Sequence, residues 1–413
     1  LAATRVDVNG LIEKGRENLL LYSNDLTNSQ WIKSRLTAST DTSVYPNGFS
    51  SSTKILETTE NGQHYVRQLH TGVSGAVYTA SCYIKGIGRN YAKIEVLSLS
   101  TPYELYLGEI NLTTGSITKT FSGATAIDAV STDLGNGWYR ISVTGLINGK
   151  TNFGIQLYPL DDSRNSSYVG DVSKGLYVSG FQFESSLVAT DYIETGASTA
   201  QAGILEDMPR LDYSGGATCP SLLLEPSRTN LFTQSEHFNS IDWVKTNVTA
   251  TDNSNVSPEG LQNATLINEG TAAVTQHWFY QPIPLSSGNT YTISFYAKYV
   301  DRKNMFINIY DGATSNFVFY DIQNGVVLNN DGNAVRDIVD VGNGWYRIIY
   351  TRAVVGSGSN FRIGMANDTP IQTYTGENKQ ALVYGFQLEA NATYPTSYIP
   401  THGSSVTRNF DNA

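Results

Sequence analysis

The sequence contains few charged residues, two cysteines and no long apolar run. Asp, Glu, Lys and Arg make up 15% of the 413 residues, well below the quarter that is usual in globular domains. Two cysteines, Cys82 and Cys219, are too few for a disulfide framework, and their spacing matches no metal site. No apolar segment approaches the roughly 18 residues of a membrane-spanning helix. These absences argue against a disulfide scaffold, a cysteine-based zinc domain and insertion into a membrane.

Positive charge is also scarce. The chain has 27 Lys and Arg against 37 Asp and Glu, a net charge of −10, and its basic residues form no cluster. Nucleic acids and anionic membranes bind proteins through basic surfaces, so neither is an expected partner. The opening residues 1–15 lack the basic start and apolar centre of a signal peptide. The first residue is Leu1 rather than Met, which suggests a fragment or a processed product.

The apolar residues do not follow a helical period over any long segment, and the composition favours strands. The chain contains 26 Tyr and 37 Gly, with abundant Ser, Thr and Asn, a mixture typical of pleated strands and tight turns. Apolar and polar residues alternate along 291–298, and the dipeptides Asn136-Gly137 and Asn343-Gly344 are typical hairpin turns. The sequence therefore predicts an all-β protein with many short strands, arranged as jelly-roll sandwiches.

An internal repeat organises the chain. Six blocks recur in the same order, with an offset that drifts between 205 and 213 residues because loops differ in length. The paired blocks are 18–33 with 230–245, 45–48 with 257–260, 63–65 with 276–278, 78–85 with 291–298, 135–140 with 342–347, and 180–184 with 385–389.

The repeat predicts two tandem jelly-roll β-sandwich domains. We expect an N-terminal connecting segment at 1–17, the first module at 18–196, a linker at 197–229 and the second module at 230–413. The linker holds several Pro and Gly residues, but its run 222–224 is Leu-Leu-Leu. Such an apolar run does not suit a free tether, so we expect the linker to pack against one or both modules.

The aligned blocks resemble a module found in bacteriophage tail and virion proteins. The second copy carries nearly the whole pattern, from Asn230–Lys245 through Gly342–Arg347 to Gly385–Glu389, Thr396–Thr401 and Val406–Arg408. The linker stretch 220–231 and the opening Thr4-Arg5-Val6 are also typical of such phage proteins. The first copy departs from the pattern at 191–196, where it lacks a Pro.

The resemblance implies a concanavalin A-like or carbohydrate-binding-module jelly roll on a virion surface, as a tail fibre or a capsid decoration. The expected partners are glycans and other virion proteins, and a homotrimer is the implied assembly. Two other readings remain open from the residues. In the first, the modules would be purely structural capsid or tail spacers without a ligand. In the second, they would be binding modules of a polysaccharide hydrolase.

Catalytic motifs are not evident in the sequence. None of the five His residues forms a pair with metal-ligand spacing, and the chain has neither a G-x-S-x-G elbow nor a phosphate-binding Gly-rich loop. A pair of carboxylates brought together across a sandwich would suffice for glycoside hydrolysis, but no acidic pair has a recognisable context in both copies. We expect a protein without enzymatic activity.

Aromatic residues are the candidates for sugar binding, because a ring stacks on the apolar face of a pyranose while a Tyr hydroxyl also forms hydrogen bonds. The alternative for each of them is ordinary packing in the sandwich. Since neighbouring strand residues face opposite sides, Phe279 is expected in the core. The candidate ligand-binding residues are Trp278, Tyr280 and Tyr296 in the second copy, and Tyr65 and Tyr83 in the first.

A structural calcium ion is a secondary expectation, implied by the likeness to carbohydrate-binding modules. Asp25 or Glu236, from the opening block of each copy, would supply oxygen ligands together with Glu184 or Glu389 from the closing block. The alternative is that these are ordinary carboxylates without a metal.

Overall fold

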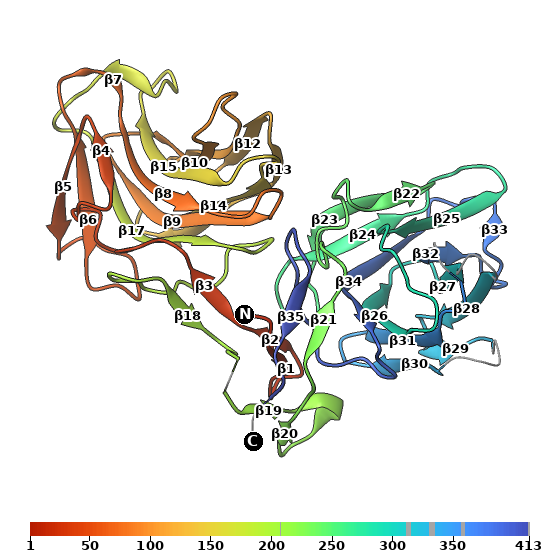
Figure 1. Cartoon of the computed structure of the whole chain (residues 1–413). Helices are drawn as coiled ribbons and strands as arrows, with labels where there is room; N and C mark the ends of the chain where they lie inside the picture. The colour runs from red at the N-terminus through yellow and green to blue at the C-terminus, as the bar shows by residue number, and fades with distance from the viewer. Residues whose placement is uncertain (207, 311–314, 330–334, 357–359, 412–413) are drawn as a thin grey trace. The chain divides into compact units, whose positions relative to one another are not determined.

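The computed structural model describes residues 1–206, 208–310, 315–329, 335–356 and 360–411. The chain divides into two compact units (Figure 1). One unit is Arg16–Ala202, called the first sandwich below. The other combines Leu1–Gly15 with Gly203–Ala413 and is called the second sandwich. Each is described separately.

Both units are built from antiparallel β-strands, as the composition predicted. Within the described residues, the short 3-10 turn η1 (Ser214–Gly216) is the sole helical element. None of the helical structure described is long or apolar enough to cross a bilayer. The fold is all-β, with two jelly-roll sandwiches, which confirms the predicted fold class.

The first sandwich consists of two six-stranded sheets. One has the order β12-β11-β10-β15-β8-β4 and the other β13-β14-β9-β17-β6-β5. Small ladders join β16 to β7 and β18 to β3. The bounds are β3 (Arg16–Asn18), β4 (Ile32–Ser34), β5 (Leu36–Asp41), β6 (Ser52–Glu57), β7 (Asn61–Gln63), β8 (Tyr65–Thr71), β9 (Tyr78–Ile87), β10 (Tyr91–Ser98), β11 (Leu105–Asn111), β12 (Ile117–Ser122), β13 (Thr125–Gly135), β14 (Trp138–Leu146), β15 (Asn152–Leu160), β16 (Ser167–Val169), β17 (Gly175–Glu184) and β18 (Ala200–Ala202).

The second sandwich repeats this arrangement strand for strand. Its sheets have the orders β22-β25-β32-β27-β28-β29, with β33 pairing to β25, and β23-β24-β34-β26-β31-β30. The bounds are β22 (Val244–Thr246), β23 (Thr249–Asn255), β24 (Ala264–Asn268), β25 (Thr275–Tyr280), β26 (Thr290–Tyr299), β27 (Asn304–Tyr310), β28 (Ser315–Asp321), β29 (Val326–Val327), β30 (Val335–Asp340), β31 (Trp345–Ala353), β32 (Asn360–Ala366), β33 (Thr373–Tyr374) and β34 (Gln380–Ala390).

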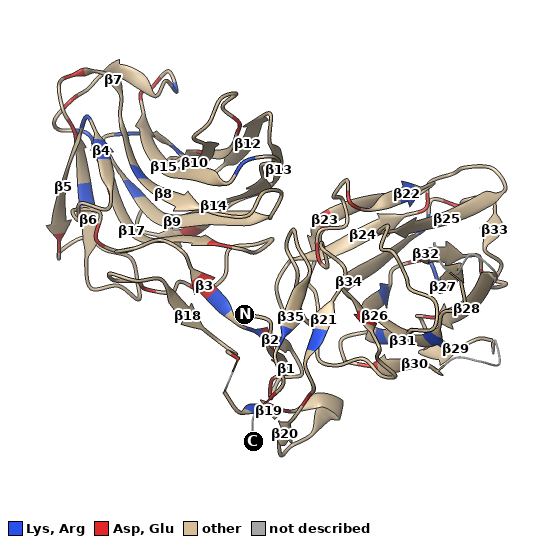
Figure 2. Ribbon diagram, in the orientation of Figure 1, with Lys and Arg blue, Asp and Glu red and all other residues tan. Residues whose placement is uncertain are grey.

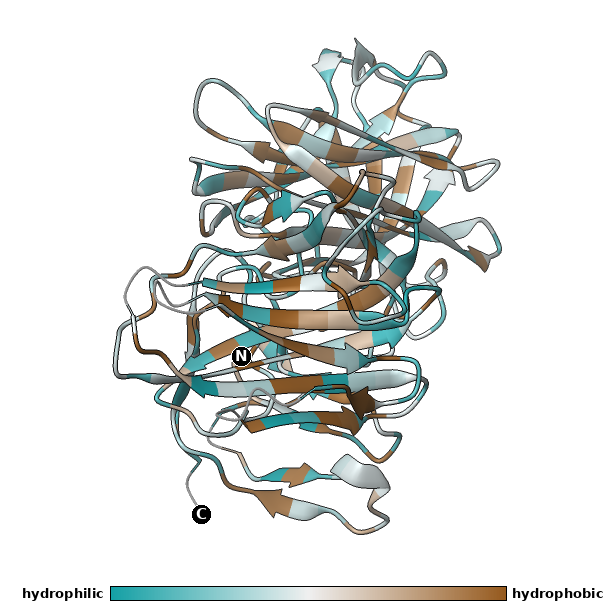
Figure 3. Cartoon of the chain, turned by 90° about the vertical axis from the view of Figure 1, so that its right-hand side faces the viewer, coloured by the Kyte–Doolittle hydropathy of each residue, from teal (hydrophilic) through white to brown (hydrophobic). Residues whose placement is uncertain are grey.

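The core of each sandwich lies between its two sheets, because alternate residues of each strand face inward. Figure 3 shows apolar and polar residues alternating along the strands. Trp31 and Phe181 pack against each other in the first core, with ring centroids 5.0 Å apart. Trp243 and Phe386 pack in the second core at 5.4 Å. Trp31 and Trp243 occupy equivalent places in the repeated blocks 18–33 and 230–245, and both are buried.

Repeated residues occupy equivalent places in the two sandwiches. Trp138 opens β14 opposite Lys85, and Trp345 opens β31 opposite Lys298. The preceding Asn-Gly turns have the same positive φ angles, 53° and 76° at Asn136 and Gly137 and 55° and 75° at Asn343 and Gly344. The repeat found in the sequence is therefore also a repeat of strand register.

The N-terminal segment belongs to the second sandwich rather than to the module that follows it in sequence. It forms a hairpin of β1 (Thr4–Val6) and β2 (Ile12–Lys14). The Lys14 ammonium lies 2.8 Å from a Glu236 carboxylate oxygen and 2.9 Å from one of Glu259. Burial disfavours the ammonium, but these two carboxylates outweigh it and raise the pKa of Lys14. The chain therefore leaves the second sandwich at residue 15 and returns to it at 203.

The linker forms short strands within the second sandwich. β19 (Arg210–Asp212) pairs with β20 (Ser221–Leu223), and β21 (Arg228–Asn230) pairs with β35 (Val406–Arg408). Leu222 and Leu224 of the apolar run are nevertheless half exposed, at 50% and 52%. Buried polar contacts of Arg210, described below, hold this segment instead of apolar packing.

Figure 2 shows that Lys and Arg are scattered singly over many elements.

Candidate functional site

A buried cluster common to both sandwiches fixes which positions correspond. In the first sandwich, Arg89 forms two hydrogen bonds of 2.6 Å with Glu57, which also accepts a hydrogen bond of 2.9 Å from the Tyr168 hydroxyl. His64 stacks on the Tyr168 ring at 4.5 Å. In the second sandwich, Arg302, Glu269, Tyr374 and His277 form the same cluster. His64 thus corresponds to His277, and the following residues Tyr65 and Arg67 correspond to Trp278 and Tyr280.

The outer face of one sheet in the second sandwich carries adjacent aromatic rings. Phe279 is buried in the core at 1% exposure, so Trp278 and Tyr280 point away from the core, as the alternation of β25 predicted. Their ring centroids are 5.2 Å apart. Both side chains are half-buried, which leaves part of each ring accessible.

Strand register extends this aromatic surface across the sheet. Trp278 pairs with Gly364, Gly364 pairs with Phe306, and Phe306 pairs with Phe319. In the pairing of β25 with β32, Ile363 lies opposite Phe279, which places Arg362 beside Tyr280. In the pairing of β32 with β27, Arg362 lies opposite Asn308. Two further rings belong to the same face. The outer aromatic face, as named below, comprises Trp278, Tyr280, Phe306, Tyr310, Phe317 and Phe319.

A glycine makes the centre of this face continuous. A Cβ atom at Gly364 would collide with the Phe306 ring, so only glycine lets that ring lie across β32 toward Trp278. Phe306, Phe319, Trp278 and Phe317 form a hydrophobic cluster separate from the main core. Tyr310, at the end of the face, is 40% exposed.

Polar groups lie among the rings. The Asn308 amide donates to Ser315 Oγ at 2.9 Å and to the Asn316 carbonyl at 3.0 Å. Its oxygen is buried and has no hydrogen-bond partner among the described residues, and the same is true of the Asn304 oxygen. Buried acceptors without a partner are costly, and both residues alternate along β27 with the rings of Phe306 and Tyr310. Arg362 completes the polar set, with its guanidinium carbon 4.6 Å from the Trp278 ring centroid.

The corresponding face of the first sandwich is a closed polar network. Arg67 donates to Gln156 at 2.7 Å, Gln156 donates to Glu95 at 2.9 Å, and the Lys93 ammonium lies 2.9 Å from Glu95. Burial and the Glu95 charge raise the pKa of Tyr158, whose hydroxyl donates to Glu95. The strand register shows which residue of the second sandwich stands at the place of each residue of the first. Trp278 replaces Tyr65, Tyr280 replaces Arg67, Arg362 replaces Gln156, Phe306 replaces Lys93 and Asn308 replaces Glu95.

The other predicted aromatic residues lie in different surroundings. Tyr65 is on the polar face, where the Arg67 guanidinium lies 4.6 Å from its ring centroid. Tyr83 and Tyr296 lie on the other sheet of each sandwich, below Arg140 and Arg347 at 5.3 and 5.6 Å. Tyr296 is only 5% exposed, because Tyr384 and Tyr398 pack against it.

The predicted calcium ligands are engaged in other interactions. Asp25 accepts hydrogen bonds from the backbone and hydroxyl of Thr27 in an exposed turn. Glu184 and Glu389 are buried and accept hydrogen bonds from Thr190 and Thr396, which anchors the segment after each last core strand. Glu236 is occupied by Lys14 and by tyrosine hydroxyls. In the part of the chain that is described, no three His, Cys, Asp or Glu side chains are grouped so as to hold a metal ion.

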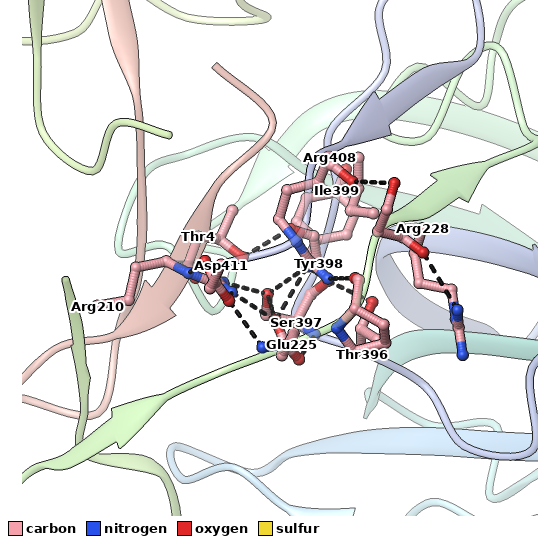
Figure 4. A network of polar contacts seen from close by, with 12 residues as sticks. Thr4, Arg210, Glu225, Arg228, Thr396, Ser397, Tyr398, Ile399, Arg408 and Asp411 are labelled. Carbon is pink, nitrogen blue, oxygen red and sulfur yellow. Dashed lines mark hydrogen bonds and ion pairs between the residues drawn. The ribbon is translucent and has the colours of Figure 1, made fainter. Parts of the chain in front are cut away.

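A second polar cluster lies where the N-terminal hairpin meets the linker and the C-terminal residues. Arg210 is 1% exposed and pairs with Glu225 at 2.9 Å and with Asp411, while its third nitrogen donates to the Thr4 carbonyl at 2.8 Å (Figure 4). A cavity of about 140 Å³ lies beside this cluster, lined in part by Tyr296 and Arg347. Its polar groups already bind one another, so the cluster holds the segments together.

Sequence reasoning missed the three phenylalanines of the outer aromatic face. Phe306, Phe317, Phe319 and Arg362 were not among the candidates, because a Phe in an alternating strand has the same pattern whether it faces the core or the outside. One signal was available in the sequence. Phe306, Phe317 and Phe319 alternate along their strands with Ile307 and Val318, which the pattern assigns to the core. The three Phe side chains must therefore face the other side of the sheet.

Comparisons with known proteins give little guidance. No family model and no curated protein matches the chain. Among solved structures, the tandem CBM22-1–CBM22-2 domain of Xyn10C from Paenibacillus barcinonensis is 14% identical, covers 91% of this chain and 98% of its own, and has a TM-score of 0.30. Oxalate decarboxylase from Lactobacillus farciminis, in its formate complex, is 11% identical, with coverages of 91% and 88% and a TM-score of 0.15. These TM-scores are too low to carry an argument, so the jelly-roll assignment rests on the chain's own sheets.

Proposed function

We propose that this chain is a non-enzymatic glycan-binding protein that holds a saccharide on the outer aromatic face of its second sandwich. The observation that carries the proposal is the pair Trp278 and Tyr280. Their rings lie 5.2 Å apart on the side of β25 away from the core, and both side chains are half-buried. Of the four further rings on the same side of β27 and β28, Tyr310 and Phe317 are also partly exposed, whereas Phe306 and Phe319 are buried beside them. Rings of this kind are normally buried in a sandwich core.

The chemistry of the face suits a sugar better than an apolar ligand. A pyranose presents C–H groups on its flat faces and hydroxyls around its edge, so it needs rings with polar atoms beside them. Trp278 and Tyr280 provide the rings, and the Asn308 and Asn304 oxygens are acceptors without a donor among the described residues. Water-mediated contacts would complete the binding of the hydroxyls.

The virion location belongs to the same proposal. Its support is the sequence pattern 230–245, 342–347 and 385–408, which resembles phage tail and virion modules. In this setting the protein would be a tail fibre or a capsid decoration exposed on the particle, in contact with other virion proteins. Immunogold labelling of intact particles tests the location, and absence of the chain from purified particles would contradict it.

The glycan proposal predicts a strong effect of Trp278→Ala. Loss of a stacking ring should cost about 1–3 kcal/mol, which corresponds to a roughly 5- to 150-fold weaker association constant. Binding is measured on a glycan array and then by calorimetry with the best glycan. Because Trp278 is outside the main core, the folded fraction by circular dichroism should match the parent protein.

Two matched variants sharpen this test. Tyr65→Ala removes the corresponding ring in the first sandwich and should leave binding nearly unchanged. Phe279→Ala removes the neighbouring core ring and should lower stability by about 3–5 kcal/mol. If the parent protein binds no glycan, the modules are structural spacers. If Trp278→Ala binds as tightly as the parent, the site lies elsewhere.

A further inference from the structure

The outer aromatic face contains a cation, Arg362, that pairs with no carboxylate of the described residues. Arg362 donates from Nε to the Asn360 side chain at 3.0 Å. Its guanidinium carbon lies 4.6 Å from the Trp278 ring centroid and 5.9 Å from that of Tyr310. Within the described residues, Arg362 forms no ion pair, although other Arg side chains of the second sandwich, such as Arg302, do.

The first sandwich shows how the same fold neutralises cations at this place. There Lys93 pairs with Glu95, and Arg67 reaches the same carboxylate through Gln156. In the second sandwich the position of Glu95 is taken by Asn308, a neutral side chain with a free acceptor oxygen. The exchange therefore leaves a positive charge on a surface of aromatic rings.

From this geometry we infer that the glycan held by the second sandwich is acidic, and that Arg362 binds a carboxylate on the sugar ring stacked against Trp278. This inference rests on the glycan-binding function proposed above. A guanidinium presents two parallel N–H groups that match a carboxylate, and it is weakly hydrated, so it keeps this preference beside aromatic rings. A carboxylate on the sugar would supply the negative charge that Asn308 does not.

The net charge of the chain does not oppose this assignment at short range. The chain carries −10 overall, which repels an acidic glycan at a distance. At physiological ionic strength, however, charges are screened over about 8 Å. Arg362, in direct contact with the ligand, then outweighs the distant carboxylates. Affinity for the acidic glycan should still fall as salt is raised.

The test compares acidic polysaccharides with the same polysaccharides after chemical reduction of their carboxyl groups to alcohols. The full chain is measured on an array of both forms, together with neutral and sulfated glycans. We expect at least tenfold tighter binding of a carboxylated glycan than of its reduced form. In Arg362→Gln this ratio should fall to about one while binding of the reduced form is retained, and Arg362→Lys should restore part of the ratio.

The control is Arg228→Gln, which removes the same charge from an Arg on β21 of the second sandwich that donates to the Ser227 carbonyl. It should leave the ratio unchanged. Equal binding of the acidic and reduced forms by the parent protein would overturn the inference, as would binding of sulfated glycans alone. In both cases a loss of binding in Trp278→Ala would still support the proposed function. If the parent protein binds no glycan, the proposed function fails and the inference fails with it.

Discussion

The two sandwiches share a framework and differ on one face. The buried cluster of Glu57, Arg89, Tyr168 and His64 in the first has a counterpart at every position in the second. On the outer face of the adjoining sheet, by contrast, a network around Glu95 is replaced by aromatic rings around Gly364. Residues that hold the fold together are thus retained between the copies. The exposed face is where they have diverged in chemistry.

The difference also extends to the N-terminal hairpin, which only the second sandwich contains. Lys14 fills a buried polar site formed by Glu236 and Glu259, beside Tyr384 and Tyr398. The first sandwich has Asn24 and Asn47 at the positions of these two carboxylates in the aligned sequence. It therefore has no pair of negative charges that would require a lysine.

The largest expected effect is that of Lys14→Ala. Removing the ammonium leaves the carboxylates of Glu236 and Glu259 buried without Lys14, and breaking a buried ion pair in this way costs about 3–5 kcal/mol. The loss should appear as faster amide hydrogen exchange throughout the second sandwich during denaturant titration. Exchange in the first sandwich should not change.

Two further variants separate charge from packing at this site. Lys298→Ala removes a lysine whose ammonium donates to the exposed Asn343 carbonyl, and it should cost less than about 1 kcal/mol. Combining Lys14→Met with Glu236→Gln and Glu259→Gln should recover most of the stability. A Lys14→Ala protein as stable as the Lys298→Ala protein would show that the hairpin is not held by this pair.

The second prediction concerns the shared cluster and should affect both sandwiches alike. Arg89→Met and Arg302→Met each leave one buried carboxylate, Glu57 or Glu269, without its guanidinium. Each should lower the stability of its own sandwich by about 3 kcal/mol, measured by hydrogen exchange resolved to the two units. An effect confined to one sandwich would mean that the two clusters are not equivalent.

Much of the fold was predictable because its signals are local. Alternation in β25 placed Phe279 inside and Trp278 outside, and the Asn-Gly dipeptides located two of the turns. The attachment of the N-terminal hairpin was not predictable, since Lys14 and Glu236 are 222 residues apart and no local pattern links residues so distant in the sequence. The outer aromatic face was only partly predicted. Its completion depends on the register of β27 against β32 and of β28 against β27, which alternation within single strands does not determine.

The smallest expected effect tests whether the Asn-Gly turns contribute equally to the stability of the two sandwiches. Gly137 and Gly344 have φ angles of 76° and 75°, a region that an L side chain adopts only at a cost of roughly 1 kcal/mol. A Cβ atom at either site would approach only the flexible side chains of Lys85 or Lys298, at 3.6 and 3.5 Å. Steric conflict therefore adds little. Gly137→Ala and Gly344→Ala should each destabilise their own sandwich by about 1 kcal/mol in denaturant unfolding.

Asn136→Gly supplies the matched control for these turns. Asn136 also has a positive φ, 53°, which Gly adopts without strain, so this variant should change stability by only a few tenths of a kcal/mol. Because the two turns precede the equivalent strands β14 and β31, the Ala variants should agree with each other within the error of the measurement. A much larger loss in one of them would show that the turn in that sandwich has a role beyond reversing the chain, and the equivalence of the copies would end at that hairpin.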